Sequence, residues 1–351
     1  MKAWENNIRR VTPYVPGEQP DIPGMIKLNT NENPYPPSPA VLKAMRKLQI
    51  EKLRLYPDAA AKALVKALAD YYDLEENQVF VGVGSDDVLA MAFMTFFNSD
   101  KPILFPDITY SFYDVWAELF HIPYKCPALD DNFRIRKEDY YQENGGIVIA
   151  NPNAPTSIGE DITFVRDILE HNRDSVVIVD EAYVDFGGVS ALKLTKEFDN
   201  LLVVQTFSKS RSMAGMRIGY AMGNPLLIKA LNDVKYSYNS YTMNVTSIYY
   251  GLEAVKDVAY YKECIGKIIR TREWVKKELK KLGFTFPDSQ TNFIFAKHRT
   301  VPAKKIFTDL KKENIFVRYF NKPRIDNYLR ITIGTDEQME KVLEVLRRIV
   351  N

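Results

Sequence analysis

The chain has 351 residues, which is enough for two domains and an ample buried core. Lysine and arginine (47) nearly balance aspartate and glutamate (45), so a net charge of +2 offers no broad basic field for nucleic acid or an anionic membrane. Two cysteines and three scattered histidines support neither a disulfide framework nor a metal site. With no apolar run of membrane-spanning length and no secretory signal, we expect a cytoplasmic protein.

The first forty residues are rich in proline, with eight prolines between Pro13 and Pro39. This density is typical of an extended arm that crosses a surface, because proline removes a backbone donor and interrupts regular structure. We therefore expect an arm over residues 1–35 and a first helix near residues 40–49.

Short β-rich runs then alternate with helical patterns. Nearly continuous apolar runs separated by helices predict a mainly parallel sheet covered on both faces, with strands at 79–83, 103–105, 146–150, 176–179 and 201–205. Residues 243–283 form one long amphipathic helical pattern, and a compact α+β pattern follows, with strands at 292–296, 315–317 and 329–333 and helices at 302–313 and from 336. We expect a large domain over residues 36–245 and a smaller one over 246–351.

A lysine follows the last of the large-domain strands. Lys209 lies four residues beyond the run 201–205, after Thr206 and Ser208, and Arg217 comes eight residues later. A lysine at a strand end, with hydroxyls and an arginine nearby, can supply an amine for an imine and a cradle for a phosphate. A solvated loop lysine is the commoner case for a lysine taken alone.

Asp180 ends a run of four β-branched residues, which places a carboxylate at the carboxyl end of a buried strand. Such a carboxylate can pair with a protonated ring nitrogen, and Tyr183 can direct a phenol at the same ligand. A helix cap or a magnesium ligand is the alternative for Asp180.

Two further loops follow strands. Gly84, Ser85 and Asp86 stand between a strand and a helix, and amides at such a helix N-terminus bind phosphate, although the pattern is neither a dinucleotide fingerprint nor a P-loop. The run Asn151-Pro152-Asn153-Ala154-Pro155 is stiffened by its prolines, so it can either direct an amide at a ligand or serve as a rigid turn.

Six motifs in this order resemble fold type I pyridoxal 5′-phosphate enzymes, and within them the histidinol-phosphate aminotransferase branch. They are Asn31-Glu32-Asn33-Pro34, Gly84-Ser85-Asp86-Asp87, Asn151-Pro152-Asn153-Ala154-Pro155-Thr156, Asp180-Glu181-Ala182-Tyr183, Ser208-Lys209 and Arg217-Ile218-Gly219-Tyr220. The resemblance covers nearly the whole chain. It implies an α/β fold with a central, mainly parallel sheet and a smaller α+β C-terminal domain, pyridoxal 5′-phosphate as cofactor, and ping-pong conversion of histidinol phosphate and 2-oxoglutarate to imidazole acetol phosphate and glutamate.

The resemblance also implies roles for single residues. Lys209 matches the lysine that forms the aldimine with the cofactor and moves the proton between Cα and C4′, and Asp180 matches the partner of the pyridinium nitrogen. Tyr183 matches the donor to the phenolate oxygen, and Tyr110 the aromatic residue stacked on the ring. The phosphate cup would be formed by Gly84, Ser85, Asp86, Thr206, Ser208 and Arg217.

Other matched positions concern the substrate and a second subunit. Arg330 matches the arginine that binds the acidic group of the substrate, and it can grip a carboxylate or a phosphate. Tyr56 resembles the tyrosine that reaches the cofactor phosphate of the other subunit, which implies a homodimer. The remaining substrate-side positions are Asn292, Asn31 and Glu32. Arg318 and Arg324 could add to a phosphate site, although a solvated surface arginine is the commoner case.

The chain departs from the family pattern at two positions. Ala154 stands where the family commonly has the asparagine that bonds the phenolic oxygen, so either Asn153 takes over this contact or the contact is lost. Ser157 replaces the usual glycine, which requires another backbone conformation or some strain.

Three other functions share some of these features. An aromatic amino acid aminotransferase and a threonine-phosphate decarboxylase would keep the same fold and cofactor. A non-enzymatic cofactor-binding regulator would need a DNA-binding module and a clustered positive surface, and neither is visible in the sequence. We expect a small-molecule amino donor and a 2-oxo acid acceptor as partners.

Overall fold

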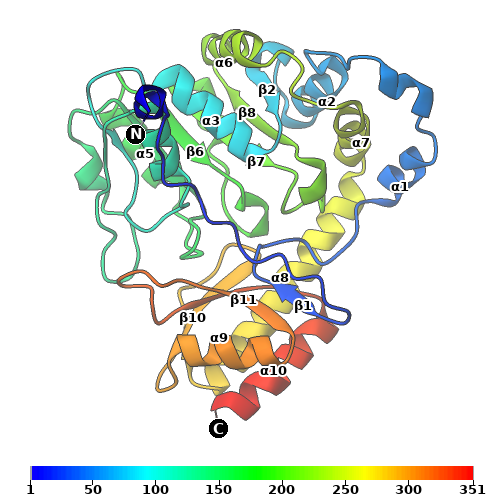
Figure 1. Cartoon of the computed structure of the whole chain (residues 1–351), viewed down its shortest axis with the longest axis vertical. Coiled ribbons are helices and arrows are strands. Elements are labelled where there is room, and N and C mark those ends of the chain that lie inside the picture. Colours follow the sequence, from blue (N-terminus) through cyan, green and yellow to red (C-terminus); the bar gives the residue numbers. More distant parts are fainter. Residues whose placement is uncertain (1, 351) are drawn as a thin grey trace.

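The computed structural model describes residues 2–350 and has a large α/β unit above a smaller one (Figure 1). The large unit is built on a seven-stranded sheet in the order β2-β8-β7-β6-β5-β3-β4. Strand β8 runs antiparallel to β2 and β7, and the other neighbouring pairs are parallel, which confirms the expected mainly parallel sheet. The strands are β2 (Val79–Gly82), β3 (Ile103–Leu104), β4 (Tyr124–Lys125), β5 (Gly146–Ala150), β6 (Val177–Asp180), β7 (Leu201–Thr206) and β8 (Gly219–Gly223).

Helices cover both faces of this sheet because successive strand side chains point to opposite faces. In β6, Val177 and Val179 enter one buried cluster and Ile178 enters the other. The first cluster packs under α1 (Pro39–Met45), α2 (Lys62–Tyr72), α5 (Ile162–His171) and α7 (Val245–Lys256). The second packs under α3 (Ser85–Phe96), α4 (Tyr113–Phe120) and α6 (Pro225–Tyr238).

The smaller unit has a five-stranded sheet in the order β1-β11-β12-β10-β9. Strand β1 comes from the arm and pairs in parallel with β11, so the arm is part of this sheet before it reaches α1. The elements are β1 (Ile26–Leu28), β9 (Phe284–Thr285), β10 (Phe293–His298), β11 (Ile315–Tyr319), β12 (Leu329–Thr332), α8 (Val258–Lys281), α9 (Ala303–Lys312) and α10 (Asp336–Val350). Their apolar sides share one core.

The long helical pattern of residues 243–283 is two helices. Helix α7 ends at Lys256, and Asp257 caps the start of α8 by accepting a hydrogen bond from the amide of Tyr260 at 3.5 Å. Helix α7 packs against α1 and α2 in the large unit, whereas α8 descends into the smaller one (Figure 1). The expected domain boundaries stay predictions, and this packing favours a change of domain between α7 and α8.

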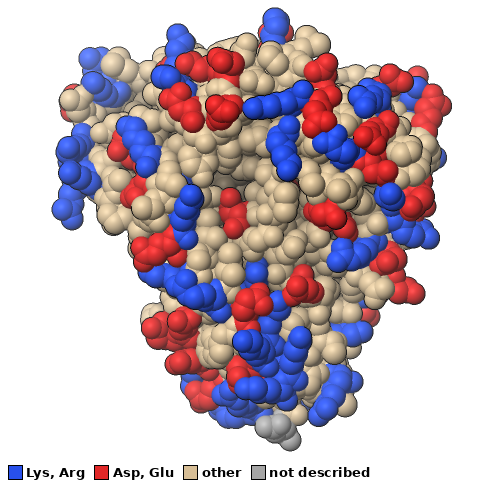
Figure 2. Space-filling view, turned by 180° about the vertical axis from the view of Figure 1, so that it is seen from behind, with Lys and Arg blue, Asp and Glu red and all other residues tan. Residues whose placement is uncertain are grey.

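Short 3₁₀ turns complete the chain at Ala3–Asn7, Ile50–Arg54, Glu76–Gln78, Lys137–Tyr140, Val184–Phe186, Leu192–Lys196 and Ala214–Met216. None of the helices formed by residues 2–350 combines the length and the apolar character needed to cross a bilayer. On the face shown in Figure 2, acidic and basic side chains are interspersed over both units. The cytoplasmic location remains a prediction.

Candidate active site

A cavity of about 430 Å³ lies where the ends of β6 and β7 meet the start of α3. We call it the central cavity. It brings together residues that are far apart in the sequence but were predicted to act together, because the carboxyl ends of parallel strands meet at one edge of a sheet. The predicted residues that line it are Glu32, Ser85, Asp86, Tyr110, Asp180, Tyr183, Thr206, Ser208, Lys209 and Arg217.

Lys209 extends into the central cavity from the loop after β7. Its ammonium donates a hydrogen bond to the carbonyl of Thr30 at 3.0 Å and lies 5.8 Å from the centre of the Tyr183 ring. The arm therefore accepts one of the three N–H donors of the Lys209 ammonium, and the ammonium lies among the other polar groups that line the cavity. A half-buried amine in this place can act as a nucleophile or carry a proton.

Asp180 is the last residue of β6 and is 5% exposed. Its carboxylate accepts hydrogen bonds from the Tyr113 hydroxyl at 2.8 Å and from the amide of Ala182 at 3.2 Å. Burial raises its pKa to about 6, although these two hydrogen bonds act in the opposite direction. A buried carboxylate of this kind is stabilised by a cationic partner, such as a protonated ring nitrogen. No sequence motif pointed to the contribution of Tyr113.

The hydroxyl of Tyr183 is oriented by a hydrogen bond from Asn31. Its oxygen accepts a hydrogen bond from the Asn31 amide at 2.8 Å, which leaves its own proton free to be donated into the central cavity. Asn31 is fixed in turn, since its side chain accepts from the Thr332 hydroxyl at 3.0 Å. Asn31 therefore acts by orienting Tyr183, and it does not line the cavity itself.

A second group of polar side chains lies around the start of α3. Gly84 precedes α3 with φ of +84°, a backbone conformation that favours glycine, and the Arg217 guanidinium lies close to the position that a Cβ would take. Arg217 reaches Asp86 at 3.0 Å and the Ser208 hydroxyl at 3.5 Å. Thr206 and Ser208 are linked at 3.0 Å through their hydroxyls. Free amides of a helix N-terminus beside an arginine and hydroxyls form a site for a phosphate.

Tyr110 forms part of an aromatic wall. Its hydroxyl donates to Asp86 at 2.7 Å, and burial together with that carboxylate raises its pKa well above the ordinary value, so it stays protonated. Its ring packs at 5.6 Å from Phe112 and 5.7 Å from Tyr113. Glu32 lies on the other side of the cavity. Burial alone would raise the pKa of Glu32, but hydrogen bonds from Lys27 and Thr30 lower it below its usual value.

The loop after β5 bears on the two alternatives left open for Asn153. The Asn153 side chain donates to the carbonyl of Ile108 at 2.9 Å and accepts from the Thr109 hydroxyl at 2.7 Å, so its amide holds neighbouring loops together. Ala154, rather than Asn153, lines the cavity. The expected cofactor contact of Asn153 is therefore not supported. Ser157 keeps a positive φ of 68°, so it retains the glycine-like conformation at some strain.

Arg330 and Asn292 lie behind the central cavity on the smaller unit. Arg330 donates to the carbonyl of Asn29 at 2.9 Å, but its Nε is buried without a partner among the described residues. Asn292 donates to the carbonyl of Asn31 at 3.0 Å, and its Oδ1 is likewise unpartnered. Burial lowers the pKa of the Arg330 guanidinium. Buried polar atoms left without partners indicate a place for a ligand or an ordered water.

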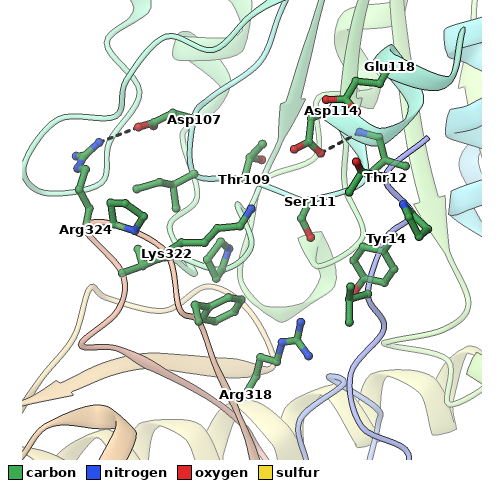
Figure 3. A pocket seen from close by; sticks show the side chains of 18 residues that line it. Thr12, Tyr14, Asp107, Thr109, Ser111, Asp114, Glu118, Arg318, Lys322 and Arg324 are labelled. Carbon is green, nitrogen blue, oxygen red and sulfur yellow. Dashed lines mark hydrogen bonds and ion pairs between the residues drawn. The ribbon is translucent and has the colours of Figure 1, made fainter. Parts of the chain in front are cut away.

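A second cavity of about 580 Å³ adjoins the first and shares Tyr14 with it (Figure 3). In this outer cavity, basic side chains of the smaller unit face acidic side chains of the large unit. Arg324 is bound to Asp107 at 3.0 Å and to two backbone carbonyls, so it joins the two units, as Figure 3 shows. Arg318 instead points into the cavity, whereas a solvated surface arginine is the commoner case for such a position.

The arm covers both cavities. Tyr14 stacks on Phe112 with ring centres 4.1 Å apart, and Pro16, Gly17 and Gln19 line the central cavity. The sequence predicted the arm but not these contacts, because proline-rich segments carry no pairing pattern that would locate them. Tyr56 lies elsewhere: it is 82% exposed, its ring centre is 4.7 Å from that of Tyr241, and it lines neither the central nor the outer cavity.

Residues 23–346 match the family model described as aminotransferase class I and II. The chain belongs to this family of aminotransferases. Curated relatives of this aminotransferase include two histidinol-phosphate aminotransferases. That of Clostridium botulinum strain Okra is 51% identical over 100% of this chain and 99% of that protein. That of Lactococcus lactis subsp. cremoris is 52% identical over 98% of this chain and 97% of that protein.

Solved structures share the fold of this aminotransferase. The histidinol-phosphate aminotransferase of Clostridium acetobutylicum superposes with a TM-score of 0.85, 23% identity and coverage of 93% of this chain and 99% of that one. The histidinol-phosphate aminotransferase of Sinorhizobium meliloti was solved in complex with pyridoxal 5′-phosphate. It superposes with a TM-score of 0.83 and 22% identity, over 93% of this chain and 90% of that one. These likenesses confirm the expected fold.

The cofactor of this aminotransferase is pyridoxal 5′-phosphate, and the central cavity fits it. The cavity has the volume of a small-ligand site and offers donors for a phosphate. Asp180 offers a carboxylate for a ring nitrogen, and Tyr183 offers a phenol proton for a ring oxygen. Lys209 lies on the same cavity with the primary amine that a carbonyl group requires.

Proposed function

We propose that this aminotransferase converts histidinol phosphate and 2-oxoglutarate to imidazole acetol phosphate and glutamate. The relatives that support this proposal are 51% and 52% identical to this chain in sequence, and they match over almost the full length of both chains. The two half-reactions use the same site in turn, so the amino group leaves the first substrate before the second one enters.

The observation that carries this choice of substrate is a pair of arginines. Arg318 of β11 and Arg330 of β12 are partners in the antiparallel register, and both guanidinium groups lie within 6 Å of the Phe320 ring, at 5.8 and 5.7 Å. Among residues 2–350 neither one has an acidic side chain within salt-bridge distance. Two unneutralised guanidinium groups suit a phosphate, which carries close to two negative charges, better than a single carboxylate.

The residues of the central cavity would divide the chemistry. When bound, pyridoxal 5′-phosphate supplies the electron sink that stabilises negative charge at the substrate α carbon. Asp180 holds a proton on the ring nitrogen, and Tyr183 donates to the ring oxygen. Lys209 takes the proton from the α carbon and delivers it to the acceptor carbon, since it brings a primary amine to the central cavity.

We also propose that two chains form a dimer in which Tyr56 reaches the phosphate end of the partner's cavity. The segment that carries Tyr56 exposes apolar side chains, with Ile50 at 72% and Tyr56 at 82% exposed, and Leu53 and Leu55 are about half exposed. Apolar side chains clustered on one surface favour burial against a partner. A second copy of this chain would cover them and would place two phenols in two equivalent sites.

A transaminase acting on aromatic amino acids is the second candidate. The aromatic wall formed by Tyr14, Phe112 and Tyr110 accepts a phenyl ring as readily as an imidazole. The arginine pair separates the two candidates, because phenylalanine has no phosphate for Arg318 to bind.

The test compares the first half-reaction with histidinol phosphate and with histidinol, followed by the change in cofactor absorbance. The wild type should react with histidinol phosphate at least about 100-fold more efficiently, since each good charge-assisted contact contributes more than about 1.4 kcal/mol. Arg318→Met should lower the ratio of the two efficiencies without changing the efficiency with histidinol. Arg324→Met should leave the ratio unchanged. Equal rates with both substrates, or a faster reaction with phenylalanine, would overturn the proposal.

A further inference from the structure

Lys235 in α6 is a buried lysine that the central cavity does not use. It is 2% exposed, and its ammonium donates a hydrogen bond to the carbonyl of Ala59 at 2.7 Å. Within residues 2–350 no carboxylate lies within salt-bridge distance of it. Lysine is almost never fully buried unless it is paired, because removing the charge from water is costly. Its retention here therefore requires a structural reason.

The carbonyl that Lys235 holds belongs to the segment that carries Tyr56. Ala59 comes three residues after Tyr56, with Pro57 between them. The other hydrogen bonds of this turn are internal, since Asp58 accepts from the amides of Ala60 at 3.0 Å and Lys62 at 2.9 Å. These bonds shape the turn but do not attach it to the rest of the protein. Lys235, which is 176 positions further along the chain, provides that attachment.

Helix α6 supports the same segment at a second point. Tyr241 lies three residues beyond the end of α6, and its ring is 4.7 Å from the ring of Tyr56. Tyr241 is itself 48% exposed, so this aromatic pair alone is a loose contact. The hydrogen bond from Lys235 is the firmer of the two attachments, because a charged donor forms a stronger bond than a neutral one.

We infer that Lys235 is a positioning residue that fixes the Tyr56 segment in the conformation in which Tyr56 reaches the cofactor phosphate of the partner subunit. The inference rests on the composite site proposed above. Three residues span at most about 10 Å, so freeing the carbonyl of Ala59 would let the phenol of Tyr56 move by several ångströms. A hydrogen bond to the phosphate tolerates far less than that.

The test measures the apparent dissociation constant of pyridoxal 5′-phosphate and its release rate from the holoenzyme. Lys235→Met keeps the length of the side chain but cannot donate, and it should weaken cofactor binding about tenfold, the loss expected for one charge-assisted hydrogen bond. Lys235→Arg should bind the cofactor as tightly as the wild type, since a cavity of about 260 Å³ beside Lys235 leaves room for a guanidinium. Lys229→Met, on an exposed position of the same helix, is the matched control.

Tyr56→Phe and the double variant Lys235→Met/Tyr56→Phe separate the possible outcomes. If Lys235 acts through Tyr56, Tyr56→Phe should weaken binding to a similar degree, and the double variant should be no weaker than the single ones. Two results would overturn the inference about Lys235 but not the composite site. One is that the losses of cofactor affinity add up in the double variant. The other is that Lys235→Met weakens cofactor binding and also lowers the unfolding temperature of the cofactor-free protein. No effect of Tyr56→Phe on cofactor binding would instead overturn the composite site.

Discussion

The proposed active site has two halves, which come from different parts of the fold and differ in how far their polar groups are already hydrogen-bonded. The cofactor half comes from the ends of β6 and β7 and the start of α3, and its polar groups are bonded to one another, as in the contacts of Asp180 with Tyr113 and of Asp86 with Tyr110 and Arg217. The substrate half comes from the arm, β11 and β12. Arg318 lies there in an open cavity, and Arg330 and Asn292 each have a buried polar atom with no hydrogen-bond partner among residues 2–350.

This difference indicates how the work is divided. A preorganised set of groups at strand ends suits a cofactor that stays in place through the cycle, because those groups need no rearrangement when the reaction occurs. Unpartnered polar groups suit a substrate that comes and goes, since its binding supplies the missing hydrogen bonds. Changes in the first half should therefore abolish the chemistry, and changes in the second should alter which substrate is used.

The largest effect is expected for Lys209→Ala. Removing the amine eliminates both the covalent link and the proton carrier, so transamination should fall by about 10⁴-fold or more. The visible absorbance of the lysine-bound cofactor should be missing from the purified variant. Lys193→Ala, on an exposed position before β7, is the control and should behave like the wild type. Normal absorbance in Lys209→Ala would assign the amine to another residue.

A smaller effect is expected for Arg330→Met in the substrate half. Loss of one buried guanidinium should lower kcat/KM for histidinol phosphate by about 100-fold, mostly through KM, since a truncated buried charge partner costs about 2–5 kcal/mol. The cofactor absorbance should be unchanged, because Arg330 lines no part of the central cavity. Steady-state kinetics and the absorbance spectrum check both points. A changed spectrum with an unchanged KM would contradict the division into two halves.

Asp180 should leave a signature in the stability of the cofactor-free protein. Its folded-state pKa of about 6 lies above the usual 3.8, so the folded protein holds this proton more tightly than the unfolded chain does. The resulting stabilisation is complete below pH 3.8 and is lost as the pH rises through 6. It amounts to about 3 kcal/mol at about 1.4 kcal/mol per pKa unit.

Denaturant unfolding of wild type and Asp180→Asn across pH 4–7 measures this contribution, because the amide does not titrate. The free energy of unfolding of the wild type should fall relative to that of Asp180→Asn as the pH rises. A constant difference between the two would mean that the carboxyl group has the same pKa in the folded and the unfolded protein.

The smallest effect is expected for Arg324→Met. This arginine binds Asp107 and two carbonyls at the edge of the outer cavity, so its loss should cost about 1 kcal/mol of stability and change KM by no more than about threefold. Thermal unfolding and steady-state kinetics measure the two effects. A rise in KM as large as that of Arg330→Met would place Arg324 in the phosphate site.

The two halves also differ in how far the sequence predicted them. The run of β-branched residues into Asp180 and the strand before Lys209 have clear patterns, and both strands form within one residue of the predicted bounds. Strand β8 was missed because Gly219 and Gly223 give it little β propensity, and its strand pairing supplies what the sequence lacks. In the substrate half, β1 has only three residues, too few for a periodic signal.

Single side chains were harder to predict than elements. Arg318 looked like a solvated arginine because only the register with Arg330 reveals that the two side chains are neighbours. Asn153 looked like a ligand because it stands beside the position usually held by asparagine, but one step along a turn points its amide at Ile108 and Thr109. Orientation within a loop depends on tertiary contacts that a single sequence does not contain.

The most direct test of the account is a single-turnover experiment in which the holoenzyme is mixed separately with histidinol phosphate, phenylalanine and threonine phosphate. We predict that histidinol phosphate alone discharges the lysine-bound cofactor absorbance rapidly and yields imidazole acetol phosphate, and that 2-oxoglutarate then restores the absorbance and yields glutamate. Rapid reaction of threonine phosphate with release of CO₂, or of phenylalanine in preference to histidinol phosphate, would contradict the account.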